Sequence, residues 1–348
     1  MDEEARPLWR VTGEGATPHA PRFAPLRRSP AALAAAALLL SGASGGAWAS
    51  GLFSAPACSG APVRIMVAAQ PEIAPALSDV ASRFNVEKHR VGGRCAHARV
   101  TPVAPASYKG QADAWVPESS LWLSIVREGG STSVPLTATS VAATPVVLAT
   151  TRPVEKELVD ADVDIGWKLL LKGKAGGLPL ERIAADPSAG MTGTIAMLAI
   201  GQVDKDADVA EALRKNGGST ATLAGLMGAE RFDRPLAVST EQAVVAYNET
   251  HRPNPVVSLM PDEGTLMLDH PFAVTTKDQR RRDAAEAFQA ALGTRSARNI
   301  FQGAGFRVPD GTLAAAYASE YDLPEKAPKP LRLPARKEID EALSSWKT

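Results

Sequence analysis

Short continuous apolar runs alternate with stretches of helical periodicity from residue 63 onward. The run Val63–Ala69 is typical of a buried parallel strand, and Ile73, Leu77 and Phe84 then recur on one helix face. Alternating strands and helices predict an α/β fold with parallel sheets. The predicted strands are 63–69, 99–103, 112–116, 141–150, 236–239, 256–260 and 266–275, and the predicted helices are 73–84, 121–126, 163–171, 195–201, 209–213, 221–227, 241–246, 283–292, 296–303 and 338–346.

The first 50 residues carry the pattern of an export signal. Arg27 and Arg28 precede the apolar stretch 31–40, and small residues ending in Ala47-Trp48-Ala49 follow. We therefore expect a cytoplasmic n-region over 1–29 and a signal peptide or signal anchor over 30–50. Both alternatives stay open, because no charged residue interrupts 30–49. The arginine pair keeps the N-terminus inside, so the rest is expected outside the cell, secreted or anchored by an N-terminal transmembrane segment.

Two cysteines, Cys58 and Cys95, lie beyond the export segment. Disulfide bonds persist in oxidising compartments, so we expect these two to be bonded to each other. The bond would enclose the first predicted strand and helix. The competing states are a lipidated Cys58 with a free Cys95, or two buried thiols.

Composition excludes several classes of function. The chain has 348 residues, 22% of them charged, with a formal net charge of zero, and no basic stripe that would predict a nucleic-acid partner. It has no Gly-x-Ser-x-Gly elbow, no HExxH, no P-loop lysine motif and no EF-hand loop. His89 and His97 lie near Cys95, where a metal site is conceivable. Two surface histidines beside a disulfide are the simpler interpretation. We therefore predict no enzyme activity, no cofactor and no metal site.

Four loops share one form, because each follows a predicted strand and opens a helix. They lie around Gln70, around Ser119, over 188–194 and over 239–241. Ligands gather at the carboxyl ends of strands in open α/β sheets, and helix N-termini offer free N–H groups to anions. Ser and Thr are also ordinary N-cap residues, so only the repetition favours a ligand. The candidate ligand-binding residues are Gln70, Glu118, Ser119, Ser120, Ser188, Ala189, Gly190, Met191, Thr192, Thr194, Ser239, Thr240 and Glu241.

Over about residues 63–309 the chain resembles bacterial extracellular solute-binding proteins of the type II periplasmic-binding class, with a topology like their molybdate-binding branch. The resemblance rests on segments such as ADAWVPESSLWL, ADPSAGMTGTIAMLAI and STEQAVVAYN. It implies two lobes, each a mostly parallel sheet flanked by helices. Lobe I would comprise residues 58–145 and 254–323, and lobe II would comprise residues 146–253. Residues 324–348 would form a Pro-rich linker and a short helix.

The resemblance also implies a function. A monomer outside the cytoplasm would capture a small polar or anionic ligand in the interlobe cleft, with a membrane transporter as a further partner in uptake. In this family the loops after equivalent strands hold the ligand, which points to Gln70, Ser119, Ser120, Ala189, Gly190, Met191, Thr192 and Thr240. Oxyanion binders have Ser or Thr in the first loop, whereas this chain has Gln70-Pro71. Molybdate or sulfate specificity is therefore not implied.

A second resemblance supplies an alternative function. The Pro-rich stretch 323–334 has the composition of a linker. It resembles the segment that precedes a von Willebrand factor type A domain in some exported bacterial proteins. The alternative is a cell-surface interaction module that has kept the fold and lost the ligand. It predicts no thermal shift with any small molecule, and a cleft filled by the protein's own side chains.

Overall fold

A computed structural model describes residues 58–187, 190–205, 207–215, 223, 234–253 and 255–347. The predicted export segment, most of the predicted helix 221–227 and the candidate residues Ser188 and Ala189 lie outside this part of the chain. Among the described residues, no helix is both long and apolar enough to cross a bilayer.

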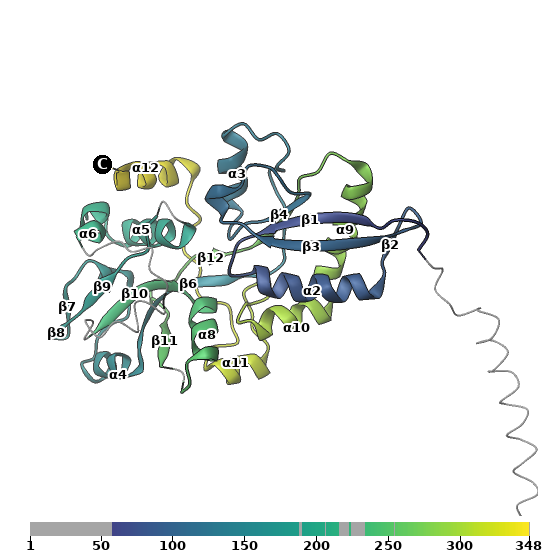
Figure 1. Cartoon of the computed structure of the whole chain (residues 1–348). Helices are drawn as coiled ribbons and strands as arrows, with labels where there is room; N and C mark the ends of the chain where they lie inside the picture. The colour runs from purple at the N-terminus through teal and green to yellow at the C-terminus, as the bar shows by residue number, and fades with distance from the viewer. Residues whose placement is uncertain are drawn as a thin grey trace, which may run out of the picture. The chain divides into compact units, whose positions relative to one another are not determined.

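The first sheet contains six strands in the order β2-β3-β1-β4-β13-β5. Helices α2 and α9 pack beside it, with α10 against both helices (Figure 1), and Leu77, Phe84 and Phe288 are buried in the core that they share with the sheet. The strand bounds are β1 Val63–Ala69, β2 Arg90–Val91, β3 Arg94–Pro102, β4 Ala114–Val116, β5 Thr139–Ser140 and β13 Pro271–Val274, and the helices are α2 Ala74–Glu87, α9 Gln279–Leu292 and α10 Arg295–Gly303.

The second sheet has the order β11-β6-β10-β9, and β12 also pairs with β6. Its core contains Trp167, Ile195 and Leu236. The strands are β6 Thr144–Thr151, β9 Glu181–Ile183, β10 Pro235–Thr240, β11 Val256–Leu259 and β12 Met267–Leu268, and the helices of this half are α4 Arg152–Asp160, η2 Trp167–Leu170, α5 Met191–Val203, α6 Val209–Lys215 and α8 Glu241–Thr250. The remaining elements are η1 Pro105–Ser107, α3 Leu121–Glu128, the hairpin β7 Lys174–Ala175 with β8 Leu178–Pro179, α11 Ala315–Tyr321 and α12 Arg336–Lys347.

Two sheets with helices confirm the two-lobed α/β expectation, but the expectation of mostly parallel sheets is wrong. Parallel pairing joins β1 to β3, β1 to β4 and β10 to β9. The other pairs in the two sheets are antiparallel. A short apolar run indicates that a strand is buried but not in which direction it runs. Strands β6 and β13 follow the two passages of the chain between the sheets, and each is antiparallel to its neighbours.

The chain crosses between the sheets twice, from β5 to β6 and back from β12 to β13. The crossings lie side by side, because the Val141 N–H donates to the His270 carbonyl at 3.1 Å. Ala143 and Arg307 add a further bridge. The return to the first sheet comes at β13, later than the boundary proposed at residue 254, because β11 and β12 both pair with β6.

Two helices differ from the sequence expectations. The helix predicted over 163–171 is wrong, since only the single 3-10 turn η2 lies there, and α4 was missed. Helix α4 is rich in charge and buries only Val154 and Leu158, so its apolar periodicity is short. The strand predicted over 266–275 is interrupted at His270, whose φ of 35° is left-handed.

The C-terminal segment is docked onto the second lobe despite its linker composition. Thr265 donates its N–H to the Lys329 carbonyl, and the Leu331 N–H donates to the Thr265 carbonyl. Helix α12 then packs on α5 and α6 through the fully buried Ile339, as Figure 1 shows.

The predicted disulfide is confirmed. Cys58 and Cys95 are bonded, with their Cα atoms 5.2 Å apart. The Ser59 N–H also donates to the Gly93 carbonyl. The first described residues are therefore tied to the β2–β3 hairpin.

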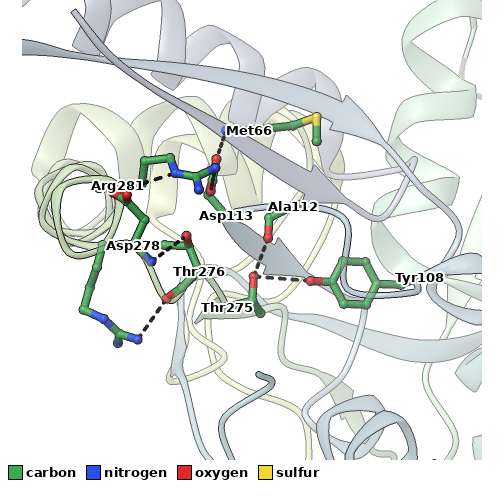
Figure 2. Close-up of polar contacts among 9 residues, drawn as sticks. Met66, Tyr108, Ala112, Asp113, Thr275, Thr276, Asp278 and Arg281 are labelled. Atoms are coloured by element: carbon green, nitrogen blue, oxygen red, sulfur yellow. Dashed lines mark hydrogen bonds and ion pairs between the residues drawn. The ribbon is translucent and has the colours of Figure 1, made fainter. Parts of the chain in front are cut away.

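A polar network closes the far end of the first sheet (Figure 2). Asp113, just before β4, accepts from the Met66 N–H at 2.9 Å and pairs with Arg281 at 3.1 Å. Asp278 caps α9 through the Arg281 N–H. Thr275 donates its hydroxyl to the Ala112 carbonyl at 2.8 Å. These groups hold α9 to β4 at the ends of the strands opposite to the candidate loops.

Candidate functional site

The loops after β1 and β4 leave the same edge of the first sheet. Ala69 and Val116, the last residues of these parallel strands, are register partners, and the Gln70 N–H donates to the Val116 carbonyl at 2.8 Å. The Gln70 side-chain oxygen then accepts from the Glu72 N–H at 2.8 Å. The sequence pattern thus leads to two adjacent loops, one at Gln70 and one at 117–120.

Glu118 connects the first sheet to the second lobe. Its carboxylate is buried and accepts from the Met191 N–H at 2.6 Å and from the Trp122 indole N–H at 2.9 Å. Met191 is the first residue of α5, so the acceptor lies at the positive end of that helix. A Cβ on Gly190 would lie 3.1 Å from the carboxylate, so a glycine there permits the close approach. Two of the predicted loops are therefore in contact.

Glu72 is a further candidate that was not among the residues predicted from the sequence. It lies between Gln70 and α2, which begins at Ala74. Its pKa is raised to about 7 by burial among surrounding protein atoms and by the Glu118 carboxyl, against a hydrogen bond from Gln70. Its side chain nevertheless remains exposed to solvent. Burial also raises the pKa of Glu118, although its hydrogen bonds oppose the shift.

The N-terminus of α3 is satisfied by groups of the protein itself. The Ser120 N–H donates to the Asp269 carboxylate at 2.7 Å, and Ser140 donates its hydroxyl to the same carboxylate at 3.2 Å. The Ser119 hydroxyl oxygen accepts from the Leu121 N–H at 3.3 Å. Of the two predicted serines, only Ser120 is exposed.

The start of α5 is held by close backbone contacts. The buried Thr194 hydroxyl donates to the Pro187 carbonyl at 3.0 Å, while Thr192 is half-buried. A Cβ on Gly193 would lie 2.3 Å from the Ala185 carbonyl oxygen, which only glycine avoids. Gly193 therefore allows the start of α5 to pack closely on Ala185.

The loop 239–241 uses its polar groups within the fold. Thr240 caps α8 by accepting from the Ala243 N–H at 3.1 Å, and the Ser239 hydroxyl lies 3.5 Å from the Thr240 carbonyl. Glu241 forms a buried bidentate ion pair with Arg307, at 2.6 and 2.9 Å. Burial raises the pKa of Glu241, and Arg307 opposes that shift. The side chains of Thr240 and Glu241 thus bind α8 and Arg307, whereas the side chain of Glu118 binds the first residue of α5.

His270 is next to Glu118 in the structure and was not among the residues predicted from the sequence. The backbone N–H of His270 donates to the backbone carbonyl of Glu118 at 3.2 Å. The ring is fully buried, and it stands edge-on to Phe306 at 5.2 Å between ring centres. Burial lowers the pKa of His270 to about 3, so the ring is neutral at the chain crossing.

A cavity of about 790 Å³ lies between α5, α6 and α12, where Met197 and Ser345 are among its lining residues. It does not include the loops at Gln70 and Glu118. Within the described part of the chain, no group of three or more His, Cys, Asp or Glu side chains is placed to hold a metal ion.

Comparisons with known proteins support the fold. Solved structures that match include a periplasmic thiamin-binding protein, with a TM-score of 0.60, 14% identity and coverage of 82% of this chain and 95% of that chain. The sulfate-binding protein of Mycobacterium tuberculosis matches with a TM-score of 0.56, 18% identity and coverage of 82% and 97%. A periplasmic binding protein of Actinobacillus pleuropneumoniae, solved with exogenous fructose-6-phosphate, matches with a TM-score of 0.54, 14% identity and coverage of 82% and 98%.

The sequence comparisons decide the family. No curated protein matches the chain by sequence. The model of a family described as bacterial extracellular solute-binding protein matches residues 65–307, well over half of the chain. The chain therefore belongs to the bacterial extracellular solute-binding proteins, a class that binds solutes outside the cytoplasm and is not a class of catalysts.

Proposed function

We propose that this protein captures a small polar solute at the junction of its two lobes. The proposed contacts are Gln70, Glu72, Glu118, Gly190 and Met191. The observation that carries the proposal is the buried hydrogen bond from the Met191 N–H to Glu118, at 2.6 Å. It joins a loop of one sheet to a helix of the other, which is where a solute would contact both lobes.

Capture requires the lobes to separate and close. Glu118 and Met191 are in contact, so their separation would expose the Glu118 carboxylate and the first N–H groups of α5. The paired crossings at 140–144 and 268–271 are the natural hinge, because they link the two sheets. A solute that contacts both loops would favour the closed arrangement.

This set of contacts is narrower than the one predicted from the sequence. Ser119 and Thr240 cap helices, and Glu241 neutralises Arg307. We assign these three to the fold rather than to the solute. Ser120 and Thr192 remain candidates at the edge of the junction, because both retain exposure to solvent.

The proposal extends to the cellular context. The family acts outside the cytoplasm, and the N-terminal pattern of Arg27-Arg28 and the apolar stretch fits export as a secreted or anchored monomer. We propose that the captured solute is passed to a membrane transporter and is not chemically altered.

The test is a melting-shift screen followed by calorimetry. The full mature chain is screened against amino acids, amines, sugars and oxyanions, together with Glu118→Gln and the matched surface control Glu286→Gln on α9. We expect at least one solute to raise Tm in the wild type and the control, and to bind at least fivefold more weakly to Glu118→Gln. No shift with any solute would favour the interaction-module alternative.

A further inference from the structure

The helix N-termini at the junction are already occupied by acceptors of the protein. The first N–H of α5 donates to the Glu118 carboxylate, and the Ser120 N–H before α3 donates to the Asp269 carboxylate. A helix N-terminus attracts anions because its N–H groups are free and its dipole is positive there. Here a carboxylate holds that position, so an oxyanion would have to displace it.

Among the residues that the structure describes, no Lys or Arg forms an ion pair with either glutamate at the junction. Glu118 is 4% exposed and receives hydrogen bonds only from neutral N–H donors, Trp122 and Met191. Within the described part of the chain, no Lys or Arg side chain is among the groups that shift the pKa of Glu72 or Glu118. Glu241, by contrast, has Arg307. A buried carboxylate without an opposite charge is costly, and a bound cation removes that cost.

The position of Glu72 gives access to this pair. Glu72 is exposed to solvent, and the Glu118 carboxyl is close enough to it to contribute to the raised pKa of Glu72. Ionised carboxylates are acceptors only. In their ionised form the two carboxyls are therefore matched by a solute group that donates hydrogen bonds and also balances their charge, as an ammonium or a guanidinium does.

Resting on the proposed function, we propose that the solute presents a cationic amine or guanidinium to Glu118 and Glu72, and that Glu118 excludes oxyanions by filling the anion position of α5. Glu118 is then the residue that sets specificity. It repels an incoming anion and attracts a cation, and both effects disappear when its charge is removed.

The test uses putrescine and ethanolamine as amine probes, and sulfate and phosphate as oxyanion probes, in calorimetry at low ionic strength. The wild type and Glu286→Gln should bind an amine probe and give no heat with sulfate or phosphate. Glu118→Gln keeps the shape and one acceptor oxygen, and it should bind the amine at least tenfold more weakly. Glu72→Gln should also weaken the binding of the amine probe. Glu118→Ala frees the α5 amide and should gain binding of sulfate or phosphate.

The outcomes separate this inference from the proposed function. A neutral or anionic solute that binds the wild type and is lost in Glu118→Gln, with no amine bound, would overturn the inference and leave solute capture standing. If no probe or screened solute binds any variant, both are overturned. Chemical unfolding of each variant shows that a loss of binding comes from a folded protein, and Glu118→Gln remains informative if Glu118→Ala does not fold.

Discussion

At the scale of single residues, buried charges in this protein have two kinds of surroundings. Glu241 faces Arg307 in a fully buried pair that also reaches the carbonyls of Gly311 and Lys326. Glu118 has only neutral donors. The first arrangement is balanced within the fold, whereas the second has no opposite charge among its described hydrogen-bond partners. Charge balance therefore distinguishes a structural glutamate from a candidate binding one.

The buried pair predicts a large cost for Glu241→Gln. The change leaves Arg307 charged and buried without its partner, so the free energy of unfolding should fall by about 3–5 kcal/mol. Urea unfolding measures it. Glu157→Gln, at the partly exposed pair with Arg234, is the control and should cost less than about 1 kcal/mol. Equal small losses in both variants would show that Glu241 has no structural role.

His270 predicts an acid-sensitive stability. Its pKa is about 3 in the folded protein, whereas an unfolded histidine has a pKa of about 6.5. Below about pH 6.5 the unfolded chain binds more protons than the folded one, so stability should fall as the pH is lowered from there toward 3. His270→Asn, which tolerates the left-handed backbone, should show a shallower fall in urea unfolding between pH 7.5 and pH 4.5. Parallel curves for the two proteins would contradict this.

At the scale of elements, the sequence predicts best where burial is continuous. Strand β1 has its predicted bounds, and α2 has its predicted apolar face. The pattern could not reveal strand direction, and it missed α4 because charged side chains cover most of that helix. The approach of Glu118 to α5 depends on tertiary packing, which local periodicity does not encode.

The β2–β3 hairpin and its disulfide predict a measurable stabilisation. The bond spans 37 residues, for which the chain-entropy model gives about 4 kcal/mol. Cys58→Ser/Cys95→Ser should therefore unfold at lower urea than the oxidised wild type, and reduced wild type should match the variant. Denatured, unreduced wild type should offer no thiol to an alkylating reagent. One free thiol with a diacylglycerol mass on Cys58 would show a lipid anchor instead.

At the scale of the whole molecule, the two lobes are joined by chain crossings and by a side-chain contact that lies beside them. The crossings β5–β6 and β12–β13 link them covalently, and Glu118 with Met191 links them non-covalently. The C-terminal segment adds a further link, because Arg336 of α12 pairs with Glu128 of α3 at 3.4 Å. A solute that holds the junction closed therefore acts on the arrangement of both lobes.

The most direct test of this account is residue-resolved hydrogen exchange with and without the solute that raises Tm most. The first N–H groups of a helix lack intrahelical partners, so Thr192 and Gly193 report on the junction. Exchange at 191–193 and in the loop 118–120 should be at least tenfold slower when the solute is bound. Slowing confined to the cavity between α5, α6 and α12, around Met197 and Ser345, with 191–193 unchanged, would contradict it.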